Sequence, residues 1–142
     1  MSGSSPARLY AALVGGALVI GGIVGFFYDA SFSTGDDLKA DAVLGILEVN
    51  GWHNLVHIAT GLLGLAAAGY AARNYALALG LAYLLIAIWG FLETENGFGA
   101  ILDVIPVNTE DNFLHLILGL TGLAAGAATP KAEPPLKTPA GA

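Results

Sequence analysis

The chain has 142 residues, of which 56% are hydrophobic and only 11% are charged. An ordinary soluble domain carries about 25% charged residues, so this composition argues against a soluble globule. The sequence holds no cysteine, which excludes a disulfide scaffold. A net charge of −6 with five Lys and Arg excludes a nucleic-acid binder, because a phosphate backbone needs cationic partners. The composition therefore indicates a small integral membrane protein in contact with a lipid bilayer.

Four apolar segments predict four membrane-spanning helices, over about residues 9–27, 52–72, 75–92 and 112–128. Each is long enough to cross a hydrocarbon core of about 30 Å at about 1.5 Å per residue. In lipid the backbone polar groups must be paired within the segment, which favours helices. We expect the spans to form one domain over residues 8–128. Residues 1–7 and the Pro-rich segment 129–142 are expected to be mobile ends.

Charged residues divide unequally between the two sets of helix ends. One set, which includes both termini, carries four basic residues and one acidic residue, whereas the other carries one basic residue and ten acidic residues. The positive-inside rule therefore predicts a protein of the bacterial cytoplasmic membrane with both termini in the cytoplasm. The long acidic loops, about residues 28–51 and 93–111, are expected to lie outside.

The sequence also repeats itself. Residues 8–27 match residues 73–92 at eight of twenty positions, and residues 49–68 match residues 107–126 at ten of twenty. Shared apolar composition does not explain the polar pairs in register, which are Asn50 with Asn108, Asn54 with Asn112, and His57 with His115. We predict an all-α, up-down four-helix bundle of two tandem helical hairpins, related by a pseudo-two-fold axis along the membrane normal.

Glycine residues follow the polar positions along one face of the second and fourth expected helices. Small residues let membrane helices approach each other closely. We therefore expect helix packing at Gly61 and Gly64 in the second helix, and at Gly119 and Gly122 in the fourth.

Histidine and carboxylate side chains gather near the outer ends of the same two helices. His53 and His57 lie four residues apart and so share a helix face, and His115 is the repeat partner of His57. Imidazole and carboxylate groups are suitable ligands for zinc or a similar divalent ion. The candidate metal ligands are His53, His57, His115, Asp111 and Glu93.

A structural interpretation accounts for the same region without a ligand. Asn50, Asn54, Asn108 and Asn112 could form a polar cluster with the histidines and cap two helix N-termini. Paired histidines could also serve as axial ligands of a haem or as a catalytic base. We assign no catalytic residue and no organic cofactor site, since the sequence holds no nucleophile elbow, P-loop or dinucleotide fingerprint.

Two stretches of the sequence resemble a bacterial membrane family catalogued as domain of unknown function 4383. They are V-N-G-W-H-N-L-V-H-x3-G-x2-G-L-A-A, from Val49, and V-N-x2-D-N-x-L-H-x3-G-x2-G, from Val107. The resemblance covers about residues 49–126 well and the first helix loosely. It implies a four-helix inner-membrane protein of unassigned biochemistry. Its polar signature falls on Asn54, His57, Asp111, Asn112 and His115.

Two classes of function follow from these observations. The Gly-rich helix faces and the lack of a catalytic constellation favour a non-enzymatic accessory subunit or scaffold in a membrane assembly. Its partners would be other membrane subunits or further copies of the chain. The alternative is a membrane protein that binds a divalent metal such as zinc, including an outer-leaflet hydrolase that uses a metal-bound water. A bis-histidine haem protein is a less favoured alternative.

Overall fold

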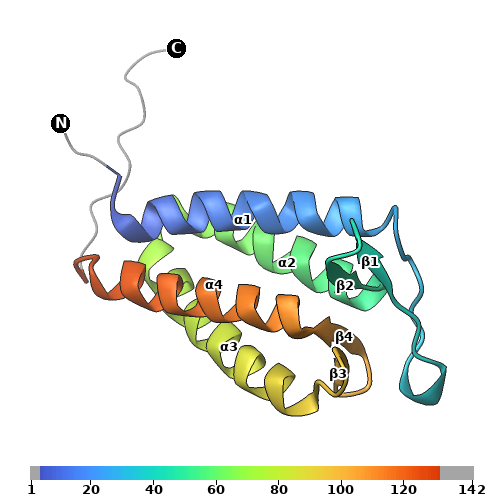
Figure 1. Cartoon of the computed structure of the whole chain (residues 1–142). Helices are drawn as coiled ribbons and strands as arrows, with labels where there is room; N and C mark the ends of the chain where they lie inside the picture. Colours follow the sequence, from blue (N-terminus) through green and yellow to red (C-terminus); the bar gives the residue numbers. More distant parts are fainter. Residues whose placement is uncertain (1–3, 132–142) are drawn as a thin grey trace.

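Residues 4–131 are described by a computed structural model, which contains four α-helices and two small β-hairpins (Figure 1). The elements in chain order are α1 (Pro6–Gly25), the 3-10 helix η1 (Gly35–Asp37), β1 (Asp41–Val43), β2 (Leu47–Val49), α2 (Gly51–Ala67), α3 (Ala72–Glu93), β3 (Phe98–Ile101), β4 (Ile105–Asn108) and α4 (Thr109–Ala127). Both hairpins lie at one end of the helices, and the start of α1 lies with the end of α4 at the other (Figure 1).

The helices pack mainly as two pairs, α1 with α2 and α3 with α4. Glycine sets the close approach within each pair. A Cβ atom on Gly61 would lie 2.6 Å from the carbonyl oxygen of Gly15, and one on Gly119 would lie 2.7 Å from the backbone nitrogen of Leu84. The glycines expected at packing positions are all buried, namely Gly61, Gly64, Gly119 and Gly122.

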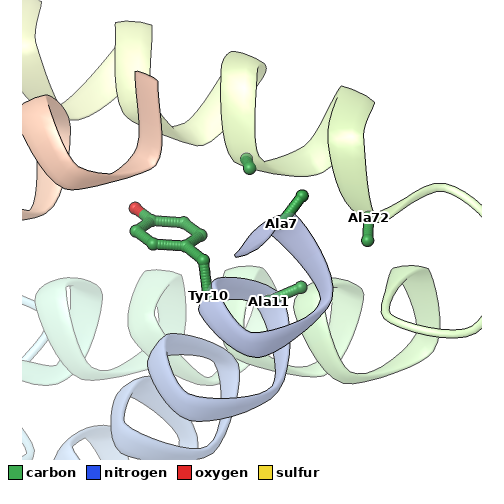
Figure 2. Close-up of a cluster of buried hydrophobic side chains, with 5 residues drawn as sticks. Ala7, Tyr10, Ala11 and Ala72 are labelled. Carbon is green, nitrogen blue, oxygen red and sulfur yellow. The ribbon is translucent and has the colours of Figure 1, made fainter. Parts of the chain in front are cut away.

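Two tyrosine hydroxyl groups connect the helix pairs. The hydroxyl of Tyr10 in α1 donates to the carbonyl oxygen of Leu118 in α4 (2.8 Å), and that of Tyr75 in α3 donates to the carbonyl oxygen of Thr60 in α2 (3.0 Å). Tyr10 also belongs to a buried cluster in which alanines from the starts of α1 and α3 meet (Figure 2). The members of this cluster are Ala7, Tyr10, Ala11, Ala72 and Ala76. The pairs are therefore held together at the end opposite the hairpins.

The β-hairpins correct the all-α expectation, because the loops between the helices of each pair contain strands. β1 pairs antiparallel with β2, and β3 with β4, in two separate sheets. Each hairpin turns through two residues with left-handed backbone, Leu44 (φ 53°) and Gly45 (φ 71°) in the first, and Leu102 (φ 57°) and Asp103 (φ 55°) in the second. The common signal for such a turn is Asn-Gly or Asp-Gly, and neither hairpin has it, so the sequence pattern did not predict these strands.

The described ends of the chain extend the helical body beyond the expected domain. α1 begins at Pro6, inside the N-terminal segment that was expected to be mobile. Thr129, the first residue of the expected tail, is buried, and its hydroxyl accepts a hydrogen bond from the backbone N–H of Ala7 (3.0 Å). The remaining parts of the two expected mobile ends, residues 1–3 and 132–142, lie outside the described residues.

Two of the helices, α1 and α3, are long and apolar enough to cross a membrane. α2 has 17 residues and ends at Ala67, so the last part of the expected second span forms a turn that leads into α3. α4 has 19 residues and carries Glu110 and Asp111 in its first turn.

Adding a methyl group at the α1–α2 contact should destabilise the fold. In Gly61→Ala the new Cβ meets backbone atoms of α1, so the two helices must separate. We expect the free energy of unfolding in mild detergent to fall by about 1–3 kcal/mol. The control is Gly16→Ala, whose Cβ meets nothing within 4 Å and which should leave stability equal or slightly higher, since alanine is the better helix former. Equal stability of the two variants would contradict the close packing.

Candidate metal centre

Two asparagines start α2 and α4 and tie the two halves of the protein together. The side-chain oxygen of Asn50 accepts from the backbone N–H of His53 (2.9 Å), and that of Asn108 accepts from the backbone N–H of Asp111 (2.8 Å). Each is thus a helix N-cap. Each side-chain amide then donates to the turn of the other hairpin. Asn50 Nδ2 donates to the carbonyl oxygen of Val104 (2.8 Å), and Asn108 Nδ2 donates to that of Ile46 (2.6 Å).

A second pair of asparagines joins the helices within each pair. Asn54 Nδ2 donates to the carbonyl oxygen of Asp29, just beyond α1, and Asn112 Nδ2 donates to Oγ1 of Thr94, just beyond α3 (both 2.8 Å). Neither asparagine is exposed. These bonds fix the hairpin ends of all four helices, and with them the positions of the side chains on the first turns of α2 and α4.

Three imidazole rings meet between the first two turns of α2 and α4. The ring centroids of His53 and His57 lie 4.3 Å apart, those of His53 and His115 lie 6.1 Å apart, and those of His57 and His115 lie 6.5 Å apart. One ring nitrogen from each histidine lies within 4.8 Å of the other two. His53 and His115 are 3% and 4% exposed, and their Nδ1 atoms have no hydrogen-bond partner among residues 4–131.

This spacing is close to what a metal ion requires. Nitrogen ligands bind zinc at about 2.0–2.1 Å, so two ligands of a tetrahedral ion lie about 3.4 Å apart. Small rotations of the three side chains would bring nitrogens that lie within 4.8 Å of one another to that separation. The cluster can therefore hold one ion with three imidazole ligands.

Asp111 lies beside the cluster but is committed to the backbone. Its Oδ2 accepts from the backbone N–H groups of Asn108 and Glu48, both at 3.0 Å. The first bond completes a capping box on α4, and the second crosses to β2. Asp111 is 3% exposed and lines the same cavity as the three histidines. It is a neighbouring carboxylate rather than a member of the three-nitrogen cluster.

Glu93 is not brought to the histidines. It is the last residue of α3 and is exposed. Its carboxylate accepts a hydrogen bond from Trp89 Nε1 one turn earlier (2.9 Å). Of the five candidate ligands, the structure gathers His53, His57 and His115, places Asp111 beside them, and leaves Glu93 on the surface.

Acidic side chains surround the hairpin end of the molecule. Burial raises the pKa of the Glu48 carboxyl above its usual range, and the carboxylate of Asp41 raises it further. Asp41 lies on β1, the strand that pairs with the strand of Glu48. A raised pKa favours the neutral form of the Glu48 carboxyl, so this residue is a weak source of negative charge for a neighbouring cation.

Two cavities of unequal size border the histidines on opposite sides. The larger, of about 420 Å³, lies between α1, α4 and the first hairpin. The smaller, of about 120 Å³, lies between α3, α2 and β4. Tyr83 of α3 occupies part of the second space, with its ring stacked on that of His115 at 5.1 Å between centroids. The sequence offered one sign of this difference, because Tyr83, in the middle of its apolar segment, aligns with the aliphatic Leu18 of the first segment.

The fold and the site define a mostly helical protein with two membrane-length helices and a histidine cluster between two helix N-termini. The chain belongs to the family described as "Domain of unknown function (DUF4383)". The match to this family covers residues 8–128. This agrees with the resemblance noted from the two polar motifs. No match was found among curated proteins or among solved structures.

Removing one helix cap should weaken both the helix and the junction between the halves. Asn108→Ala loses the cap of α4 and the bond to Ile46. We expect the free energy of unfolding to fall by about 2 kcal/mol or more. Asn108→Ser keeps a capping oxygen but not the amide donor, so its loss should be smaller. Thermal unfolding in detergent measures both variants, and equal losses would show that the cap contributes nothing.

Proposed function

We propose that this protein binds a divalent transition-metal ion such as Zn²⁺ through His53, His57 and His115. The observation that carries the proposal is the convergence of three imidazole nitrogens within 4.8 Å. Two of these rings also have buried Nδ1 atoms without a hydrogen-bond partner in the described chain. A buried polar atom without a partner costs free energy, and a bound ion would supply that partner.

The chemistry of the ligand set narrows the ion. Histidine binds metals as the neutral imidazole, and three such ligands suit zinc and its borderline neighbours cobalt, nickel and copper(II). The sequence has no cysteine and a single methionine, at position 1, so it offers no thiolate for a softer metal site. Three protein ligands leave a fourth coordination position, as in zinc sites that bind water or a substrate.

The asparagine network supports a separate role for the histidines. Asn50 and Asn108 cap the two helices, and their amides join the hairpins, without any histidine side chain. The capping role of the asparagines therefore does not account for the convergence of three rings on one point. Their convergence on one point also suits a single ion better than a haem, which is held by two rings on opposite faces of a wide macrocycle.

The proposal places this site in a four-helix membrane bundle made of two repeated hairpins. Equivalent contacts in the two halves support the repeat. The bond from Tyr10 to Leu118 corresponds to the one from Tyr75 to Thr60, at the offsets of 65 and 58 residues found in the sequence. Large apolar side chains are exposed on every helix, which supports a lipid environment. Among them are Leu13, Ile20, Leu63, Leu85 and Ile117. The orientation with cytoplasmic termini would put the metal centre near the outer face.

An accessory-subunit role is compatible with a bound ion, since a metal that joins α2 to α4 would strengthen the bundle. A hydrolase would need a substrate at the fourth position of the metal. The accessory role and the hydrolase activity are two uses of the same site. Both require that the site binds a metal ion.

The proposal predicts about one zinc ion per chain in protein purified without chelators or a histidine tag, measured by elemental analysis. Free zinc at 100 times its Kd should stabilise the folded protein by about 2.7 kcal/mol. His57→Ala should lose the ion and this stabilisation, while its helical circular dichroism stays unchanged. The control is Glu93→Gln, which alters an exposed carboxylate away from the cluster and should bind zinc normally. Zinc binding by His57→Ala at wild-type affinity would contradict the proposal.

A further inference from the structure

We propose that the larger cavity binds a long-chain carboxylate, with its head group at the metal and its alkyl chain along α1 and α4. This inference rests on the metal centre proposed above and names the class of ligand for its open coordination position. Two observed features of the cavity carry it, its lining and its opening, and the charge of the proposed ion selects the head group.

The lining is aliphatic except for four polar side chains. The walls come from α1, α2, α4 and the first hairpin, and the polar side chains among them are His53, His57, His115 and Asp111. A volume of about 420 Å³ lies within the range of about 300–1,000 Å³ that is usual for small-molecule sites. A ligand that matches this cavity has one polar head and one apolar body.

The two cavities differ most on the walls that α1 and α3 supply. At three equivalent positions of the aligned segments, the α1 residue of the larger cavity is smaller than the α3 residue of the smaller cavity. The pairs are Val14 with Leu79, Leu18 with Tyr83, and Gly21 with Ile86. The volume is about 420 Å³ beside α1 and about 120 Å³ beside α3.

The opening faces sideways, between helices. Leu13 and Leu114 line the cavity and are 64% and 38% exposed. Leu13 lies near the middle of α1, which is one of the helices long enough to cross a membrane. In the proposed bundle this opening faces the hydrocarbon core, so a ligand that partitions into lipid can enter there.

The net charge of the proposed metal centre selects the head group. A divalent ion held by three neutral imidazoles keeps both its charges, and the carboxylate of Asp111 balances one of them. A monoanionic ligand balances the other, which matters because an uncompensated buried charge is costly. A single-chain carboxylate meets this condition with one oxygen donor for the metal, and one alkyl chain suits a cavity of about 420 Å³.

The test uses protein loaded with Co²⁺ in nanodiscs, because an alkyl detergent could occupy the cavity. Visible absorption reports the ligands of Co²⁺, so dodecanoate should change the spectrum at concentrations where acetate does not. Acetate supplies the same head group without the chain, and each methylene kept out of the cavity weakens binding roughly fourfold. Equal effects of the two acids at equal concentration would overturn the proposal, because the chain would then contribute nothing.

Filling the cavity should abolish the chain effect without removing the metal. Leu18→Tyr introduces the residue found at the equivalent position of α3, and Gly21→Ile does the same one turn later, where a Cβ has free space. Each should retain Co²⁺ and bind dodecanoate roughly tenfold or more weakly. The control is Ile20→Tyr, on the exposed side of α1, which should bind normally. Wild-type dodecanoate affinity in the cavity-filling variants would overturn the proposal.

The outcomes separate the two proposals. Protein that binds no Co²⁺ would overturn both the metal centre and this inference. Protein that binds Co²⁺ with an absorption spectrum indifferent to dodecanoate would overturn the inference and leave the metal centre standing.

Discussion

The arrangement of the molecule depends on the reciprocal bonds of Asn50 and Asn108. Each residue caps its own helix and donates its amide to the hairpin of the other half. A helix N-terminus leaves backbone N–H groups unpaired, and a tight turn leaves its carbonyl oxygens free. One asparagine side chain satisfies both needs at once. The result is a rigid junction in which the first turns of α2 and α4 face each other, and the histidines on those turns are brought together as a consequence.

The proposed repeat accounts for the presence of three histidines in the site rather than two or four. His57 and His115 occupy equivalent positions, so any arrangement that brings one to the junction brings both. The third, His53, has Asp111 as its counterpart, and that carboxylate accepts the backbone N–H groups of Asn108 and Glu48. One half of the repeat thus contributes an additional imidazole, and the other contributes a carboxylate that closes a capping box. The two cavities beside the histidines also differ at equivalent positions, with Leu18 lining the larger and Tyr83 lining the smaller.

Much of this arrangement could be predicted from the sequence, because repetition places polar residues in register. The four helices, the buried glycines and the gathering of His53, His57 and His115 follow from spacing alone. The hairpins could not be predicted, since Leu44 and Leu102 occupy left-handed positions that leucine rarely adopts. Glu93 was expected among the ligands because it ends α3 near the acidic loops, but the side on which it projects depends on how α3 is rotated against α4. The cavity likewise depends on which faces of α1 and α4 oppose each other, and one sequence does not specify this.

In the proposed metal centre, three imidazoles bind one ion at the junction of α2 and α4. X-ray absorption at the zinc edge of the purified, zinc-loaded protein reports these ligands. We expect three nitrogen ligands at about 2.0–2.1 Å with the outer-shell scattering of imidazole rings, and one further light-atom ligand. Zinc surrounded only by oxygen ligands, or bound equally by a variant in which all three histidines are replaced, would contradict it.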